Sequence, residues 1–249
     1  MSLSYQKFLL FGDSITEFAF NTRPDEEAGD QFALGAALCR DYTRRLDIIQ
    51  RGFSGYTSRW ALHLLPKILE NERSSEIVMS TIFFGTNDSA SAGKQRVDLP
   101  EFTENITKMV HMLKERMIKP ILIGPALHDR ERWTALKPDQ VDQGILRSNE
   151  NNKKYSEALQ RIAIEEEIPF VNLYEAFKTQ GGDRWQELLC DGVHYSGKGY
   201  KVFYHELLKA IRSAFPELAP ENIAYKLPGW RDVKEDGSDL MQLLKGSDL

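Results

Sequence analysis

The chain has 249 residues, 41% of them hydrophobic, and a formal net charge of -5 at neutral pH. This length and composition are enough to bury a full core, and they suit one large α/β domain better than two small ones. The charge is mild and the basic residues are dispersed, which excludes the strongly basic surface of a nucleic-acid-binding protein. No nucleic acid is therefore expected as a partner.

The cysteines and the apolar runs indicate a cellular compartment. Cys39 and Cys190 are the only cysteines and have no CxxC spacing, which argues against a disulfide scaffold and against a cysteine-based zinc site. No apolar run approaches the length of a membrane span, and the run at 7–11 is too short for the core of a signal peptide. We expect a cytoplasmic protein without a membrane span.

Five short apolar runs are expected to form strands. They do not alternate strictly between apolar and polar residues, which is typical of parallel strands that are buried on both faces. The runs cover residues 7–11, 46–50, 77–84, 119–125 and 168–173.

Amphipathic segments separate these runs. In residues 100–117 apolar side chains recur at helical spacing, and Pro100 stands near the start, where its missing N–H costs nothing. Helices are also expected at 28–45, 57–71, 148–166 and 197–214. This alternation predicts an α/β fold in three layers, a doubly wound sandwich around a five-stranded parallel sheet.

Two segments fall outside this alternation. Residues 128–150 are long and polar, and they form either a partial lid or an ordinary surface excursion. From Phe215 onward the periodicity is lost, although Tyr225 and Trp230 remain as large apolar residues. We expect a main domain over 1–215 and an extension over 216–249 that packs on the domain or on a partner subunit. Because this tail contains apolar residues, a homodimer is a possible assembly.

Polar, glycine-containing segments follow the first three strands: "GDS", "RGFSGY" and "GTND". In parallel α/β sheets, ligands bind beyond the carboxyl ends of the strands, where these three segments would converge. Ser14 lies in the first of them, and the pattern Ser14-x-x-Glu17 has two interpretations. It is typical of a capping box at a helix start, and the same serine is also a candidate nucleophile.

A serine nucleophile needs a base and a group that orients the base. Of the five histidines, His194 follows Asp191 by three residues across a glycine, a spacing that lets a turn bring the carboxylate to the imidazole. The alternative is a turn aspartate and a surface histidine before a helix capped by Ser196. His128 ranks lower, because its neighbour Asp129 is adjacent in sequence. The other three histidines lie inside helical patterns.

Two further residues are candidate donors for an oxyanion. Asn87 offers a side-chain amide at the end of a hydrophobic strand, and Gly55 offers a backbone N–H with no Cβ in the way. Either residue taken alone is more often a turn former. Trp60 and Phe84 lie near these loops and are candidates for the substrate pocket, although core aromatic residues are the more frequent case.

Two motifs imitate other chemistries. "GVHYSGKG" resembles a phosphate-binding loop, but Gly199 stands where a magnesium-binding serine or threonine is needed. "HELLK" begins like the zinc motif HExxH but lacks the second histidine. No metal and no other cofactor is expected.

The four segments "FGDS", "GFSG", "GTND" and "DGVH", in this order, resemble the four blocks of the SGNH, or GDSL-type, serine hydrolases. The first block continues with Ile15 where the family name has leucine, a conservative difference. The resemblance implies a flavodoxin-like strand order 2-1-3-4-5. It also implies a catalytic triad, formed by Ser14, Asp191 and His194. The oxyanion hole that it implies is formed by Ser14, Gly55 and Asn87.

Longer stretches such as "RGFSGYTSRWALHLLP" and "YKLPGWRDV" are similar to the isoamyl-acetate-hydrolysing esterases, from about residue 5 to residue 237. This implies a serine esterase for acetate esters of small alcohols such as isoamyl acetate. The same residues would also serve a deacetylase for sugars or a thioesterase. A flavodoxin-like binding module without activity is the least favoured alternative, because no catalytic group is missing.

Overall fold

The computed structural model describes residues 4–24, 29–240 and 242. At its centre lies a five-stranded parallel sheet with the order β2-β1-β3-β4-β5, which confirms the predicted fold class. All five predicted strands are present, with ends within two residues of the expected ones. Their bounds are Gln6–Gly12 (β1), Leu46–Gly52 (β2), Ile77–Phe83 (β3), Lys119–Gly124 (β4) and Phe170–Asn172 (β5).

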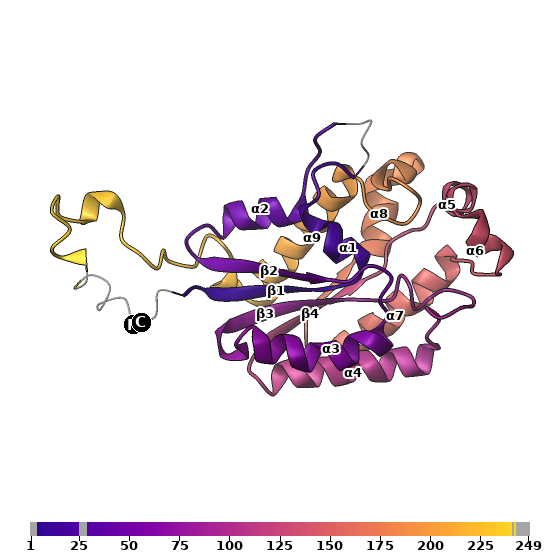
Figure 1. Ribbon diagram of the computed structural model, residues 1–249, viewed down its shortest axis with the longest axis horizontal. Coiled ribbons are helices and arrows are strands. Elements are labelled where there is room, and N and C mark those ends of the chain that lie inside the picture. The colour runs from indigo at the N-terminus through magenta and orange to yellow at the C-terminus, as the bar shows by residue number, and fades with distance from the viewer. Residues whose placement is uncertain (1–3, 25–28, 241, 243–249) are drawn as a thin grey trace.

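Helices cover both faces of the sheet (Figure 1). On one face lie α2 (Leu34–Asp41), α8 (Leu173–Gly181) and α9 (Gly197–Ala214). On the other lie α3 (Ser58–Asn71), α4 (Leu99–Lys114) and α7 (Asn149–Glu165).

Each face has its own hydrophobic core, and β1 contributes to both. Phe8 and Leu10 belong to the cluster on the side of α2, α8 and α9, whereas Leu9 and Phe11 belong to the cluster on the side of α3, α4 and α7. All four side chains are buried. Burial on both faces is the reason the strand runs show no polar alternation.

Two differences between the predicted and the observed helices have a local cause. The helix expected over 28–45 is only Leu34–Asp41, because Ala33 still has extended backbone; residue 28 lies outside the described residues. The helix α8 was not predicted, since it begins directly after β5, where the Asn172 side chain accepts the Glu175 N–H as an N-cap. A strand and a helix that meet without a loop share one apolar run, and periodicity does not separate them.

The segment 128–150 contains two short helices, α5 (Arg130–Leu136) and α6 (Pro138–Asp142). The segment after α9 first packs back on the body: the Tyr42 hydroxyl donates to Leu218 O at 2.9 Å, and Arg44 Nη2 donates to Leu227 O at 2.7 Å. Beyond it the chain runs away from the body, at the end opposite α5 and α6 (Figure 1). Within the described residues, no helix is both long and apolar enough to cross a membrane.

Candidate active site

The register of the sheet brings three loops to the same level. Gly12 at the end of β1 pairs with Gly52 on one side and with Phe83 on the other, so the chain leaves all three strands side by side. Two backbone hydrogen bonds continue the pairing, from Asp13 N to Phe83 O at 3.2 Å and from Phe53 N to Gly12 O at 3.0 Å. The predicted convergence of these segments is thus a direct consequence of strand pairing.

Ser14 is the first residue of α1 (Ser14–Glu17), a single helical turn. Of the two interpretations of Ser14-x-x-Glu17, the capping box is wrong, because Asp13 is the N-cap and its Oδ1 accepts the Ile15 N–H at 2.9 Å. The Glu17 carboxylate instead accepts the Ser54 N–H at 2.5 Å, in the loop after β2. Asp13 therefore caps the helix, and the Ser14 hydroxyl is not needed for it.

The Ser14 hydroxyl forms a hydrogen bond with His194 instead. Its Oγ lies 2.8 Å from His194 Nε2, and His194 Nδ1 lies 2.6 Å from Asp191 Oδ2. The turn that was expected from the Asp-x-x-His spacing is formed: Asp191 Oδ1 accepts the backbone N–H groups of Val193 and His194, at 2.9 and 2.8 Å. The structure thus brings Ser14, His194 and Asp191 into one hydrogen-bonded series.

The Asp191 carboxyl is held in its charged form. Partial burial raises its pKa, but the hydrogen bonds and the charge of His194, together with the two backbone donors, outweigh burial and lower the pKa below its ordinary value. A carboxylate that stays ionised next to an imidazole orients the ring and favours the imidazolium form.

His128 supports this turn from the side. Its Nδ1 lies 2.8 Å from Gly192 O, and the Asp129 N–H donates to the same oxygen at 2.9 Å. Gly192 has φ of +98°, and a Cβ there would lie 2.5 Å from Asp129 O, so only glycine fits. Burial lowers the pKa of His128 to about 4. His128 is thus a neutral structural contact, which nothing in its sequence surroundings indicated.

Asn87 and Gly55, the predicted oxyanion donors, share one hydrogen-bond network. Asn87 Nδ2 donates to Tyr56 O at 2.9 Å, next to Gly55 in the chain. Gln95 Nε2 donates to Gly55 O at 2.8 Å and to Asn87 Oδ1 at 3.3 Å. Gly55 has φ of +78°, a left-handed conformation that glycine adopts without strain.

Asp88 holds the loop that carries Asn87, a role that sequence reasoning missed. Its Oδ1 accepts the Ser58 N–H at 2.8 Å at the start of α3, and its Oδ2 accepts the Gly85 N–H at 3.1 Å. Complete burial raises the pKa of Asp88 to about 6. The sequence signal that could have indicated this role is a carboxylate next to Asn87, directly after a hydrophobic strand.

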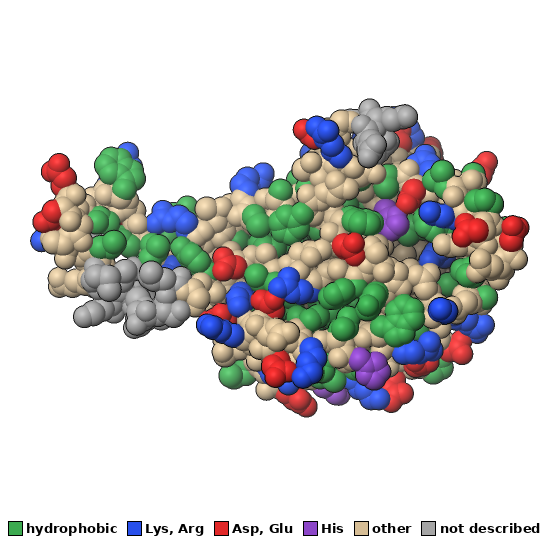
Figure 2. All heavy atoms as spheres, viewed as in Figure 1, with side chains coloured by type: hydrophobic (Ala, Val, Ile, Leu, Met, Phe, Trp, Pro, Cys, Tyr) green, Lys and Arg blue, Asp and Glu red, His purple; other side chains and the backbone are tan. Residues whose placement is uncertain are grey.

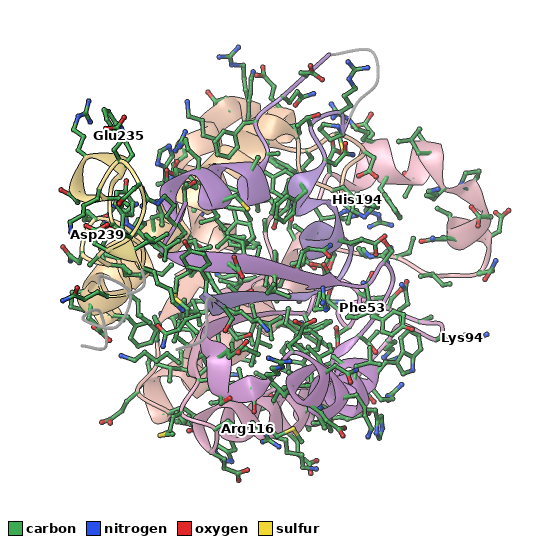
Figure 3. The ribbon with its side chains drawn as sticks, turned by 60° about the vertical axis from the view of Figure 1, so that its left-hand side comes forward. Phe53, Lys94, Arg116, His194, Glu235 and Asp239 are labelled. Atoms are coloured by element: carbon green, nitrogen blue, oxygen red, sulfur yellow. The ribbon has the colours of Figure 1, made fainter. Side chains whose placement is uncertain are left out.

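Aromatic side chains border the Ser14–His194 pair. The Phe18 ring packs edge-on against His194 at 5.3 Å between centroids, and Trp133 of α5 does so at 6.2 Å. The segment 128–150 therefore reaches the site. In Figure 3, His194 and Phe53 lie on the same side of the molecule, and Glu235 and Asp239 of the C-terminal segment lie on the other.

The two candidate pocket residues lie in different surroundings. Trp60 is half-buried and packs edge-on against Tyr56 at 5.5 Å, and Tyr56 contacts Phe53. Figure 2 shows hydrophobic side chains gathered at the surface between the sheet and the right-hand end of α3. Phe84 has no exposed surface and packs against Phe11 at 5.0 Å, so it is a core side chain. In the described part of the chain, no group of three or more histidine, cysteine or acidic residues is arranged to hold a metal.

The fold and this site define the class of the protein, a carboxylic ester hydrolase built on a flavodoxin-like sheet. Residues 10–202 match the GDSL-like lipase/acylhydrolase family, and the chain belongs to that family.

Comparisons with relatives and solved structures agree with this assignment. The chain is 59% identical to the isoamyl acetate-hydrolyzing esterase of Saccharomyces cerevisiae, over 96% of this chain and 100% of that protein. It is 33% identical to the isoamyl acetate-hydrolyzing esterase 1 homolog of Homo sapiens, over 98% and 95%. A lipase/acylhydrolase from Enterococcus faecalis superimposes with a TM-score of 0.65 at 25% identity, covering 84% of this chain and 96% of that one.

Proposed function

We propose that this esterase hydrolyses acetate esters of small alcohols such as isoamyl acetate, by way of an acyl-enzyme on Ser14. Two observations support the proposal. The chain matches the yeast isoamyl acetate-hydrolyzing esterase over that protein's whole length. Its Ser14, His194 and Asp191 form a hydrogen-bonded series at the carboxyl edge of the sheet. This series carries the mechanism.

In the first step, His194 Nε2 removes the hydroxyl proton of Ser14 while Oγ attacks the ester carbonyl. Asp191 holds the ring so that Nε2 faces the serine, and its negative charge stabilises the imidazolium that forms. The 2.8 Å distance between Ser14 Oγ and His194 Nε2 is within the range for a direct proton transfer.

The negative charge on the carbonyl oxygen needs donors that are already in place. We assign this role to the backbone N–H groups of Ser14 and Gly55 and to the Asn87 amide. The Ser14 N–H belongs to the first turn of α1, where no intrahelical acceptor exists for it.

The tetrahedral intermediate then collapses. The bond between the carbonyl carbon and the alcohol oxygen breaks, and His194 gives its proton to the leaving alcohol. A water molecule, deprotonated by His194, attacks the acetyl-serine, and acetate leaves as Ser14 regains its proton. These steps use no cofactor.

Hydrolysis of p-nitrophenyl esters from acetyl to octanoyl, with isoamyl acetate and acetylated sugars alongside, tests the proposal. Ser14→Ala should lower kcat by several orders of magnitude, since it removes the nucleophile. His205→Ala is the matched control, because His205 is exposed on α9, and it should keep full activity. Activity that persists in Ser14→Ala would contradict the mechanism. Activity that rises with acyl length, or that is higher on acetylated sugars, would contradict the substrate class.

Asn87→Ala tests the oxyanion assignment separately. Loss of one such donor lowers kcat by about 10² to 10³ in other serine hydrolases. We expect a fall of this size with little change in KM, measured on p-nitrophenyl acetate. A folded Asn87→Ala variant with the activity of the wild type would show that the donor is a different group.

Four further statements accompany this function as proposals. Trp60 is proposed to contact the alcohol group of the ester, because it lies half-buried near the Gly55 loop. Residues 1–215 are proposed as the hydrolase domain and 216–249 as an extension of it. We also propose a cytoplasmic location, which the lack of a disulfide between Cys39 and Cys190 supports. A homodimer through the C-terminal segment is supported by Trp230, which is 77% exposed, and sedimentation velocity showing only monomer would contradict it.

A further inference from the structure

Arg147 is a cation buried next to the proposed oxyanion donors. It lies in the connection between α6 and α7, and only 4% of its surface is exposed. None of the described carboxylates forms an ion pair with it; its partners are neutral oxygen atoms. Burying a charged side chain costs free energy unless its donors are all satisfied, so an arginine in this position needs an explanation.

The guanidinium donates to four oxygen atoms. Nη2 donates to Asn87 Oδ1 at 3.2 Å and to Gln95 Oε1 at 3.0 Å, Nε to Thr86 O at 3.3 Å, and Nη1 to Gln140 Oε1 at 3.2 Å. Its carbon also lies 5.2 Å from the centre of the Trp133 ring, which borders His194. Two of the four acceptors belong to the loop with Asn87, so the charge is directed at that loop.

This hydrogen bond determines which way the Asn87 amide faces. Asn87 Oδ1 accepts from Arg147 and from Gln95, whereas Nδ2 uses one hydrogen for Tyr56 O and has a second one to offer. In the flipped amide the NH₂ group would face two donors and the oxygen would face a carbonyl oxygen. Each hydrogen bond broken by the flip costs about 1 to 3 kcal/mol when the groups are buried, so a single orientation dominates.

Gln95 extends the network to the second loop. Its Oε1 accepts from Arg147, and its Nε2 donates to Gly55 O at 2.8 Å and to Asn87 Oδ1. Gln95 thus joins the Gly55 loop to the Asn87 loop, in addition to the hydrogen bond from Asn87 Nδ2 to Tyr56 O. The loop carrying Gln95 lies at the same side of the molecule as His194, as the labelled neighbour Lys94 shows in Figure 3.

We propose that Arg147 and Gln95 are positioning residues of the oxyanion hole. They hold the Asn87 amide with an N–H free for the ester oxygen and keep the Gly55 N–H next to it. The positive charge at Oδ1 also polarises the amide, which strengthens its N–H as a donor in the low-dielectric site. This inference rests on the proposed function, because it gives a task to Arg147 and Gln95 only if Asn87 binds the oxyanion.

A double-mutant cycle on p-nitrophenyl acetate tests the inference. Arg147→Met should lower kcat at least tenfold but by less than Asn87→Ala, with KM changed by less than about threefold, because the interaction acts mainly in the transition state. In the Asn87→Ala background the same change should lower kcat by a smaller factor than in the wild type, since no Asn87 amide remains to be oriented and only the support of the Gly55 loop through Gln95 is lost. Arg147→Lys should recover part of the loss. Arg130→Met, at an exposed arginine at the start of α5, is the control and should leave kcat unchanged.

Gln95→Glu is a second, isosteric variant that does not remove the buried charge. It keeps an acceptor for Arg147 but loses the two hydrogen bonds that Nε2 donates. Its kcat should fall in the wild-type background and fall by a smaller factor in the Asn87→Ala background, where only the hydrogen bond to Gly55 O is still lost, even if Arg147→Met does not fold.

The outcomes separate this inference from the proposed function. Equal losses of kcat in both backgrounds, with equal losses of thermal stability, would mean a merely structural role and would overturn the inference while the esterase mechanism stands. Full activity in Asn87→Ala would overturn the inference together with the oxyanion assignment. Activity in Ser14→Ala would overturn the mechanism on which both rest.

Discussion

Two aspartates close to the Ser14–His194 hydrogen bond have pKa values shifted in opposite directions. Asp191 has a lowered pKa, because hydrogen bonds and the charge of His194 outweigh its partial burial. Asp13 is completely buried, and burial raises its pKa to about 7, although the Ile15 N–H and the charge of His194 lower it. Asp191 thus stays ionised beside His194, whereas Asp13 keeps a proton up to a pH of about 7.

The raised pKa of Asp13 predicts a pH-dependent stability. Between pH 4 and pH 7, folded Asp13 keeps a proton that the unfolded chain has lost. The contribution of protonated Asp13 to the free energy of unfolding is therefore complete below pH 4 and is lost as the pH rises towards 7. Asp13→Asn keeps an N-cap but does not titrate. The free energy of unfolding of the variant minus that of the wild type should rise across this range, by at most about 1.4 kcal/mol per pH unit.

Urea denaturation at four pH values from 4.5 to 7.5 measures this difference. Asp47→Asn, at an exposed position on β2, controls for the loss of one carboxylate. Unfolding free energies of Asp13→Asn and wild type that run parallel over the whole range would contradict the prediction.

The same residues show how far sequence reasoning reaches at this scale. Asp191 and His194 were predictable, because three residues and a glycine determine their turn locally. Arg147 and His128 were not, because their surroundings arise only when segments distant in sequence pack together. A buried cation whose hydrogen bonds go to neutral oxygen atoms has no local sequence signal.

At the scale of elements, α1 depends on its neighbours. A helix of one turn leaves its last carbonyl groups without intrahelical partners, and isolated helices of this length are unstable in water. Tyr200 of α9 donates its hydroxyl to Ile15 O at 2.7 Å, and Gln50 of β2 donates to Glu17 O at 2.8 Å. Ser14 is therefore held in place by α9 and β2.

Tyr200→Phe should weaken this support. It leaves the buried Ile15 carbonyl without its partner, which should cost about 1 to 3 kcal/mol of stability and lower kcat severalfold, because α1 carries Ser14. Tyr204→Phe is a matched control on the same helix, since its hydroxyl contacts Asp41 and Arg40 of α2 instead. It should lower stability without a change in kcat. Thermal unfolding and kinetics of both variants test this, and an equal effect on kcat would contradict it.

Element length explains which helices could be predicted. The long helices α4, α7 and α9 have repeated apolar positions, and their periodicity is unambiguous. The short helices α1 and α5 have one or two turns, so caps and tertiary contacts decide their existence. The strands were found because each is a buried run. The order of the strands in the sheet could not be predicted from the apolar runs. It followed only from the family resemblance.

At the scale of the whole molecule, truncation experiments can determine the residue at which the folded unit ends. Regular helical periodicity stops near residue 215, which predicts a domain end there. Residues beyond this point nevertheless contact the core on the side of α2 and α9: Leu218 and Ile223 pack against it. Tyr42, which has no exposed surface, gives its hydroxyl hydrogen to Leu218 O.

Two truncations distinguish the alternatives. A chain ending at residue 228 keeps the packing of Leu218 and Ile223 and the hydrogen bonds of Arg44 to Leu227 O and Pro228 O. A chain ending at residue 215 has none of these interactions and exposes Tyr42. In a protein of this size about 1 kcal/mol corresponds to 2 to 4 °C in Tm. The shorter chain should therefore unfold several degrees below the full-length protein, and the longer one within about 2 °C of it.

Sedimentation velocity of the three chains shows whether a change in Tm comes from reduced self-association, because only a dimer makes Tm depend on protein concentration. Equal Tm values for the 1–215 chain and the full-length protein would place the end of the folded unit at residue 215. A lower Tm confined to the 1–215 chain, at every concentration, would make residues 216–228 part of the hydrolase domain itself. The apolar positions of that stretch are too few to show a helical or strand period, so only their packing reveals that they belong to the core.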